Sequence, residues 1–197
     1  MPASIAFAAA CNVAICRAQT APAKIESLPL HNFQMVSKGL YRGAEPTAEG
    51  FRQLARLGIH TVLDLRAEGG RATLEGKLVR SLGMQYMNVP LAGYQAPTPA
   101  QIAVALRILE NPLLAPVFVH CRRGADRTGT IMALYRIVHD HWTNQQALDE
   151  ARHMRMASRE RLMEQLILQY HPQRSTASKF SCLAEDTSVV GETSGVD

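Results

Sequence analysis

The stretch 117-VFVHCRRGADRTGT-130 runs from an apolar, β-rich segment into one cysteine, two glycines and three arginines, then back into an apolar helical pattern. Residues 117–121 are typical of a buried strand, and residues 127–141 have the spacing of a helix. In open α/β sheets, ligands bind beyond the carboxyl ends of the strands. The stretch therefore predicts a strand–loop–helix unit with Cys121 at the edge of the sheet where a ligand would bind.

The rest of the chain alternates between strand and helix patterns. Strands are predicted at residues 35–43, 60–66, 84–91 and 115–121, and helices at 46–58, 75–83, 97–111, 127–141, 143–155 and 158–170. The expected helix N-caps are Thr47, Thr98 (followed by Pro99), Thr143 and Ser158. This order predicts an α/β fold with a mostly parallel central sheet of four to five strands and helices on both faces.

The length of 197 residues and a hydrophobic content of 47% favour one domain with one core. We expect that domain at residues 32–171. Residues 1–31 form an apolar leader, read either as a signal peptide or as a disordered segment, and residues 172–197 have the composition of a flexible tail. No basic residue precedes Arg17, so a cytoplasmic and an exported location both stay open.

The net charge and the spacing of the cysteines exclude several classes of partner and cofactor. Lys and Arg number 21 against 17 Asp and Glu, a net charge of +4 without a basic run, so no nucleic-acid partner is expected. The cysteines Cys11, Cys16, Cys121 and Cys182 have neither disulfide-framework nor zinc-site spacing, so we expect no metal and no cofactor. A redox role for Cys182 stays open.

The loop after the central strand has the residue types of an anion site. Backbone N–H groups at a helix N-terminus attract negative charge, and the same field favours the thiolate form of Cys121. Gly124 and Gly129 allow tight curvature and close packing. Arg127 presents a planar fork that suits two phosphate oxygens. Together these residues predict a nucleophile beside a bound tetrahedral anion. The plain alternative is a core cysteine and a helix-capping arginine.

The segment HCRRGADRTG at residues 120–129 resembles the HC-x5-R-[ST] signature of the cysteine-dependent protein tyrosine phosphatases, in particular the small atypical dual-specificity type. The resemblance extends over YRGAEPT, VLDLR, NVPL and PTPAQI, and so over about residues 36–170. It implies Cys121 as nucleophile, Arg127 as phosphate ligand, His120 as the residue that orients the loop, and Thr128 as the hydroxyl that eases thiolate departure. The implied substrate-binding residues are Arg122, Arg123, Gly124, Ala125 and Gly129.

The sequence departs from the family pattern at the position of the general acid. Such phosphatases usually carry an Asp on the loop after the NVPL-type strand, but residues 91–99 contain no carboxylate. Asp126 and Glu68 are the candidates, and Asp126 has the equally weighted alternative of a loop carboxylate paired with an arginine. Asp64 is expected to be structural. Glu75 and Glu110 are expected on helix surfaces.

The resemblance implies a phosphatase that works through a cysteinyl-phosphate, acting on phosphorylated protein or peptide with tyrosine or dual specificity. The extra cations Arg122 and Arg123 favour an alternative phosphoinositide or inositol polyphosphate substrate, unless they only face solvent. An alternative of another class is a catalytically weak phospho-binding pseudophosphatase. Tyr94 and Gln95 are expected at the rim of the site, and the protein is expected to be a monomer.

Overall fold

The structure, a computed structural model, describes residues 30–172 and contains a five-stranded sheet in the order β1-β2-β5-β3-β4. β1 and β2 are antiparallel, and the other neighbouring pairs are parallel. The strands are β1 (Gln34–Ser37), β2 (Leu40–Ala44), β3 (Thr61–Asp64), β4 (Gln85–Asn88) and β5 (Val117–Cys121). The predicted α/β fold with a mostly parallel sheet is therefore confirmed, and β5 lies at its centre.

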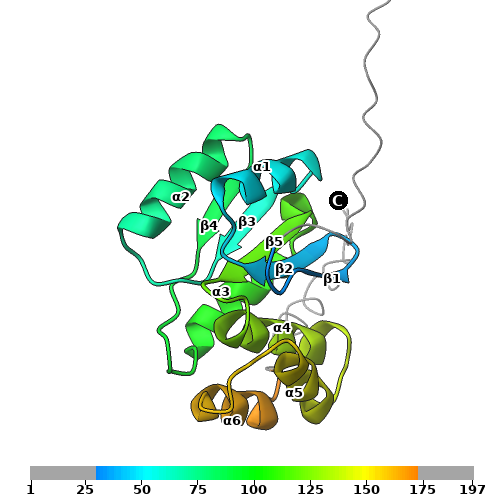
Figure 1. The fold of residues 1–197 in the computed structure, drawn as a ribbon. Helices are drawn as coiled ribbons and strands as arrows, with labels where there is room; N and C mark the ends of the chain where they lie inside the picture. Colours follow the sequence, from blue (N-terminus) through cyan, green and yellow to red (C-terminus); the bar gives the residue numbers. More distant parts are fainter. Residues whose placement is uncertain (1–29, 173–197) are drawn as a thin grey trace, which may run out of the picture.

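Helices cover both faces of the sheet, as expected (Figure 1). One face carries α1 (Ala48–Arg56) and α2 (Gly70–Ser81). The other carries α3 (Pro99–Glu110), α4 (Asp126–His139), α5 (Asn144–His153) and α6 (Arg161–Gln169), with a short 3-10 helix, η2 (Pro112–Leu114), before β5. Since both faces of β5 are covered, all five of its residues are buried.

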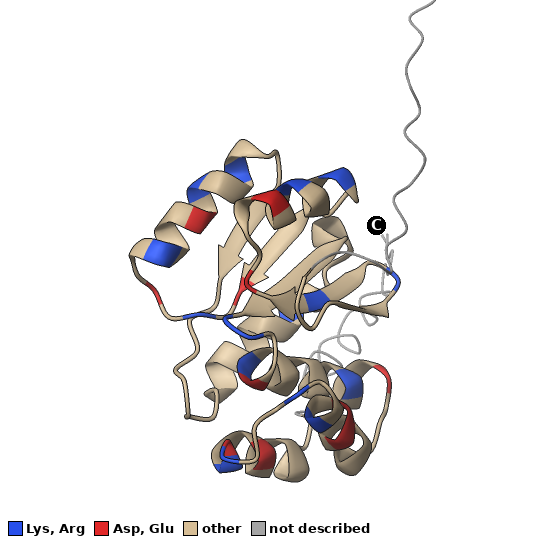
Figure 2. Cartoon of the chain, in the orientation of Figure 1, with Lys and Arg blue, Asp and Glu red and all other residues tan. Residues whose placement is uncertain are grey.

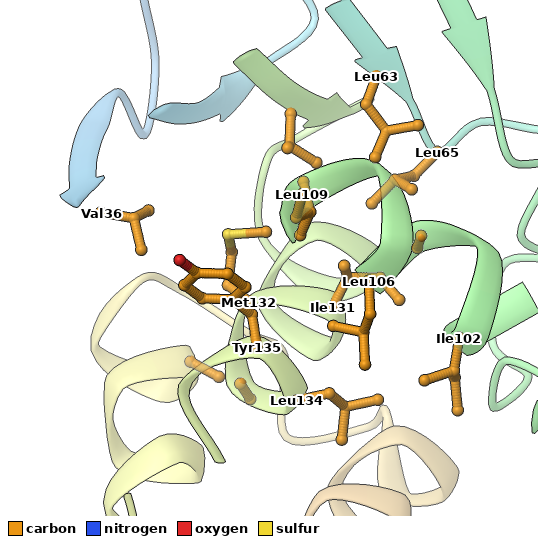
Figure 3. Packing of buried hydrophobic residues seen from close by; sticks show 14 of the residues in the cluster. Val36, Leu63, Leu65, Ile102, Leu106, Leu109, Ile131, Met132, Leu134 and Tyr135 are labelled. Atoms are coloured by element: carbon orange, nitrogen blue, oxygen red, sulfur yellow. The ribbon is translucent and has the colours of Figure 1, made fainter. Parts of the chain in front are cut away.

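Two apolar clusters hold these layers together. On the α1–α2 face, Phe51, Leu54 and Val79 pack with Val62 and Phe118. On the other face, the larger cluster joins β3 and β5 to α3 and α4 (Figure 3); its labelled members include Leu63, Leu106, Leu109, Ile131 and Met132. Because α4 is buried along most of its length, the loop that precedes it is attached to a rigid support.

Local sequence signals account for the starts of three of the six α-helices in the described residues. Thr47, Thr98 and Thr143 are N-caps whose hydroxyls accept backbone N–H bonds, and the last two form capping boxes. The expected cap at Ser158 is wrong: α6 begins at Arg161 and Glu160 occupies its N-cap position. The segment 35–43, expected as one short strand and turn, is a hairpin of β1 and β2.

Several expectations concern segments outside residues 30–172. The leader up to residue 29, the tail from residue 173, and Cys11, Cys16 and Cys182 lie beyond the described residues. Within residues 30–172, no helix combines the length and the apolar character needed to cross a membrane.

Candidate active site

The loop from Cys121 to Arg127, called here the phosphate loop, leaves the carboxyl end of β5 and enters α4. Cys121 is the last residue of β5; its thiol is free and the residue is 2% exposed. Gly124 has φ +64°, and a Cβ there would lie 2.3 Å from the carbonyl carbon and oxygen of Gly43. The loop therefore presses against β2 at a point where only glycine fits.

Arg42 lies beneath the phosphate loop, on β2, and is fully buried. Its Nη2 donates a hydrogen bond of 2.9 Å to the carbonyl oxygen of Gly124, while Nε and Nη1 have no hydrogen-bond partner among the described residues. Burial lowers the pKa of Arg42 to about 10, against the opposing effect of Glu150 and Cys121, so the guanidinium stays charged at neutral pH. The loop thus rests on a buried cation.

The first turn of α4 supplies the other polar groups. Arg127 is partly buried, and its Nη1 donates a long 3.5 Å hydrogen bond to the carbonyl of Leu91, on the loop after β4. The hydroxyl of Thr128 is buried and has no hydrogen-bond partner within residues 30–172. A Cβ at Gly129 would lie 3.2 Å from Cε of Met156, so this glycine permits close packing below the loop.

Asp126 is held by two hydrogen bonds. Its Oδ1 accepts from the backbone N–H of Ala157 at 2.9 Å, and its Oδ2 accepts from Nη2 of Arg123 at 2.6 Å. The first bond ties the phosphate loop to the connection between α5 and α6, residues 154–160. This geometry matches the arginine-paired alternative considered for Asp126 from the sequence.

A cavity of about 470 Å³ opens over the loop. It brings the thiol-bearing Cys121 together with four arginines, two carboxylates and residues of two neighbouring loops. The lining residues are Gly93, Tyr94, Cys121, Arg122, Arg123, Asp126, Arg127, Arg159, Glu160 and Met163. Tyr94 therefore lines the site as expected. Gln95 is exposed and is not among the lining residues.

Two more hollows adjoin this cavity and share Arg122 with it. One, of about 440 Å³, is lined by His31, Arg123 and Arg155 among others, and another, of about 210 Å³, by Arg66, Arg71 and Arg127. Basic segments gather in the loops that join the sheet to the helices below it (Figure 2). The surface around the phosphate loop is therefore suited to anions.

A buried ionic network supports the loop from the side of β3. Arg66 donates to both oxygens of Asp64, at 2.7 Å from Nη2 to Oδ2, and to Oε2 of Glu75 at 2.5 Å. Nε2 of His120 lies 2.9 Å from Oε1 of Glu75, but the two atoms are not aligned for a hydrogen bond. Burial acts to raise the pKa of Asp64, but the bonds from Arg66 prevail and lower it. The expected structural role of Asp64 agrees with these contacts.

The same network corrects the expectation for Glu75, which is buried rather than on a helix surface. Its partners, Arg66 in the loop after β3 and His120 on β5, lie outside α2, so the helical pattern alone could not reveal them. Asp64, Glu75 and His120 offer ligand atoms within 4.8 Å of one another, as a metal site would. The guanidinium of Arg66 already forms ion pairs with both carboxylates.

Three further charged residues at the cavity or beneath its loop were not identified from the sequence: Arg42, Arg159 and Glu160. The sequence could have indicated Arg42, since an arginine within a buried apolar strand must find a polar partner. No sequence pattern could have indicated Glu160, because it reaches the cavity only through the packing of α6. Glu68, a sequence candidate for the acid, is exposed and lines a separate hollow with Arg80 and Tyr86.

Comparisons with known proteins find phosphatases that are similar to this chain in sequence. The chain is 33% identical over 125 residues to the dual specificity protein phosphatase TpbA of Pseudomonas aeruginosa, covering 64% of this chain and 55% of that protein. It is 29% identical over 151 residues to the inositol diphosphatase SIW14 of Saccharomyces cerevisiae, covering 74% and 53% respectively. The chain thus spans about half the length of these curated relatives.

The crystal structure of the core catalytic domain of SIW14 superimposes with a TM-score of 0.63 at 27% identity, covering 73% of this chain and 88% of that one. The family model described as a DSP-PTPase phosphatase fused to NAD+ kinase matches residues 25–169. Since that match includes every helix and strand described above, from β1 to the end of α6, the chain belongs to this DSP-PTPase family.

Proposed function

We propose that the protein is a phosphatase that hydrolyses phosphate monoesters through a cysteinyl-phosphate intermediate. One observation carries the proposal: the thiol of Cys121 and the guanidinium of Arg127 line the same cavity, above a loop that rests on the buried cation of Arg42. A nucleophile, a fork for phosphate oxygens and a positive field are what phosphoryl transfer to sulfur requires.

The proposed roles follow from chemistry. The Cys121 thiolate attacks phosphorus, and Arg127 binds the equatorial oxygens together with loop N–H groups, which include those of Gly124 and Ala125. His120, paired with Glu75, orients the loop. The unpartnered hydroxyl of Thr128 is available to stabilise the departing thiolate in the hydrolytic step.

The carboxylate of Asp126 is engaged by Arg123 and by the N–H of Ala157. A proton donor needs an oxygen that is free to face the leaving group. The contacts therefore favour the loop-stabilising role for Asp126 over the acid role. Arg123 in turn is partly committed to Asp126, whereas Arg122 and Arg127 form no ion pair with a carboxylate among residues 30–172. Arg122 lines the cavity and both adjoining hollows.

Phosphorylated protein or peptide is the proposed substrate class, with dual specificity. The loop from residue 89 to residue 98 is short, so the cavity stays open enough for phosphoserine, phosphothreonine or phosphotyrosine. The name of the relative TpbA, a dual specificity phosphatase, supports this proposal.

An inositol polyphosphate or phosphoinositide is the second candidate. The observation that favours it is the set of four arginines in one cavity, Arg122, Arg123, Arg127 and Arg159, with further basic hollows beside it. One phosphotyrosine does not need so many cations, whereas a polyphosphorylated ring does. The name of the relative SIW14, an inositol diphosphatase, supports this alternative.

Steady-state phosphate release without added metal tests the proposal. The full chain and Cys121→Ser are compared on para-nitrophenyl phosphate, a phosphotyrosine peptide, a phosphoserine peptide and an inositol polyphosphate. We expect turnover by the wild type and none by Cys121→Ser; the ratio of kcat/KM between peptides and inositol polyphosphate then decides the substrate class. Equal inactivity of both proteins on every substrate, with tungstate still bound, would replace this function with the phospho-binding alternative.

A further inference from the structure

The cavity above Cys121 contains a carboxylate that the proposed chemistry has not used. Glu160 comes from the connection between α5 and α6, residues 154–160, and lies at the N-cap position of α6. The residue is only 4% exposed, so its carboxyl group is enclosed by the protein. Glu160 therefore lines the cavity and is shielded from bulk water.

The backbone holds Glu160 firmly in place. Its N–H donates to the carbonyl of Ala157 at 2.9 Å, and its carbonyl accepts from Met163 and Glu164 at 3.0 Å each. Ala157 is bonded to Asp126, so this connection is anchored to the start of α4. A carboxyl group on such an anchored turn is positioned before substrate arrives, as a catalytic group must be.

A second contact closes this connection against the loop after β4. The guanidinium carbon of Arg159 lies 5.9 Å from the centre of the Tyr94 ring, within cation–π range. Since Arg159 and Tyr94 both line the cavity, they join two of its walls. Glu160, which follows Arg159 in the chain, thus lines the same cavity as the expected general-acid loop, which has no carboxylate of its own.

The surroundings of Glu160 favour its protonated form. Its Oε2 is buried without a hydrogen-bond partner in the described part of the chain, and the nearest cation contact, from Nε of Arg159 to Oε1, is a loose 3.8 Å. Burial raises the pKa of Glu160 and the charge of Asp126 adds to the rise, while Arg159, Arg123 and Arg127 oppose it. A phosphate dianion bound by those arginines would neutralise their opposing effect.

We propose that Glu160 is the general acid and base of the phosphatase reaction, replacing the Asp that the loop after β4 lacks. The inference rests on the proposed function and adds to it the identity of the proton donor. Neither sequence candidate meets the same conditions, because both oxygens of Asp126 already accept hydrogen bonds and Glu68 lines another hollow.

The two steps balance with this assignment. In the first, the Cys121 thiolate forms the S–P bond, the bond from phosphorus to the leaving oxygen breaks, and the Glu160 carboxyl gives that oxygen its proton. In the second, the Glu160 carboxylate takes a proton from the attacking water as the new P–O bond forms and the S–P bond breaks. Inorganic phosphate leaves, and both the thiolate and the protonated Glu160 are restored.

The test compares leaving groups. The full-length wild type, Glu160→Gln and Asp126→Asn are assayed across pH on para-nitrophenyl phosphate, whose leaving group needs little protonation, and on phenyl phosphate, which needs more. For Glu160→Gln we expect kcat/KM on phenyl phosphate to fall by about 10²–10⁴-fold, a smaller fall on para-nitrophenyl phosphate, and loss of the basic limb of the pH profile. Rapid mixing with para-nitrophenyl phosphate should show a burst of nitrophenol, because the second step lacks its base.

Glu164→Gln is the matched control, since Glu164 lies on the same helix and pairs with Arg152 outside the cavity. It should keep the wild-type leaving-group dependence. Glu160→Asp keeps the carboxyl group and should retain part of the phenyl phosphate activity, which a purely structural role would not require. Tungstate affinity shows that each variant retains the site.

Each outcome of this comparison supports or overturns the assignment of Glu160 as the general acid. An equal fall on both substrates, or no fall, in a Glu160→Gln variant that binds tungstate normally would overturn the assignment of Glu160. So would loss of the basic limb in Asp126→Asn alone. In each of these cases the proposed function survives, because the wild type remains active and Cys121→Ser inert. A wild type that is inert on both substrates would instead remove the proposed function itself.

Discussion

The guanidinium of Arg42 donates a buried hydrogen bond of 2.9 Å to the carbonyl oxygen of Gly124, across the contact between β2 and the phosphate loop. The same contact is so close that a Cβ on Gly124 would lie 2.3 Å from the carbonyl oxygen of Gly43. β2 and the phosphate loop are therefore held together by close packing and by the charge of Arg42. Mutations can test these two contributions separately.

Gly124→Ala tests the steric fit. The added methyl group must displace the backbone of Gly43, and a non-glycine residue at φ +64° adds strain of about 1–3 kcal/mol. We expect a lower free energy of unfolding in urea and a large loss of tungstate affinity. Gly58→Ala is the control, because Gly58 also has a positive φ of +80°, a Cβ there meets nothing within 4 Å, and the residue does not line the cavity. Wild-type tungstate binding by Gly124→Ala would contradict the close contact.

Arg42→Met tests the charge. Methionine fills much of the same buried space but leaves the Gly124 carbonyl unpaired and removes the cation beneath the loop. We expect anion affinity to fall by at least about tenfold, equivalent to about 1.4 kcal/mol. Alkylation of Cys121 by iodoacetamide at neutral pH should also slow, because the cation that attracts negative charge beneath the loop is lost. Arg42→Lys should lose less anion affinity and less of the alkylation rate than Arg42→Met. Equal losses in the two variants would count against a role for the charge.

Asp126→Asn separates stability from chemistry. The variant loses the ion pair with the half-exposed Arg123 but can still accept the N–H of Ala157, so we expect a cost of about 1 kcal/mol, or a fall in Tm of ~2–4 °C. The ratio of rates on phenyl phosphate and para-nitrophenyl phosphate should match the wild type. A changed ratio would reassign Asp126 to proton transfer.

Asp64→Asn addresses pH-dependent stability. Because the pKa of Asp64 is lowered by its bonds to Arg66, its stabilisation is present above the ordinary Asp pKa of about 3.9 and is lost as pH falls through the lower folded-state value. The variant should therefore be less stable at neutral pH, by about 3 kcal/mol as for a broken buried pair. The difference from wild type should shrink below about pH 4, as urea unfolding at several pH values would reveal.

The stability of Glu160→Gln relative to the wild type should depend on pH in the opposite direction to that of Asp64→Asn. The raised pKa of Glu160 means that its stabilisation is complete below the ordinary Glu pKa of about 4.3 and is lost as pH rises through the higher folded-state value. At neutral pH, the neutral glutamine should therefore give a Tm equal to or above that of the wild type. A Tm well below wild type at pH 7 would show that the carboxylate stabilises the fold instead.

Much of the site was predictable because it is local. The strand from Val117 to Cys121, the glycine at position 124 and the helix that begins at Asp126 follow one another in the chain, so their pattern alone places a thiol beside a helix N-terminus. Capping at Thr98 and Thr143 was predictable for the same reason, since each hydroxyl accepts an N–H only three residues away.

The errors arose where a contact spans distant segments. The helical pattern around Glu75 predicted a surface position, but Arg66 and His120 meet it in the interior. Ser158 looked like a cap, yet the anchoring of Ala157 by Asp126 leaves Glu160 at the N-cap position of α6.

By itself, the sequence determined the α/β order and the position of Cys121 and Arg127 at the two ends of the phosphate loop, because short-range periodicity and turn residues encode them. Only the tertiary structure decided that Arg42 lies below that loop and that Glu160 closes the cavity above it. The physical reason is that these side chains reach the site through the packing of β2 and α6 against distant elements. Such packing depends on the fit of whole surfaces, which no local pattern of residues records.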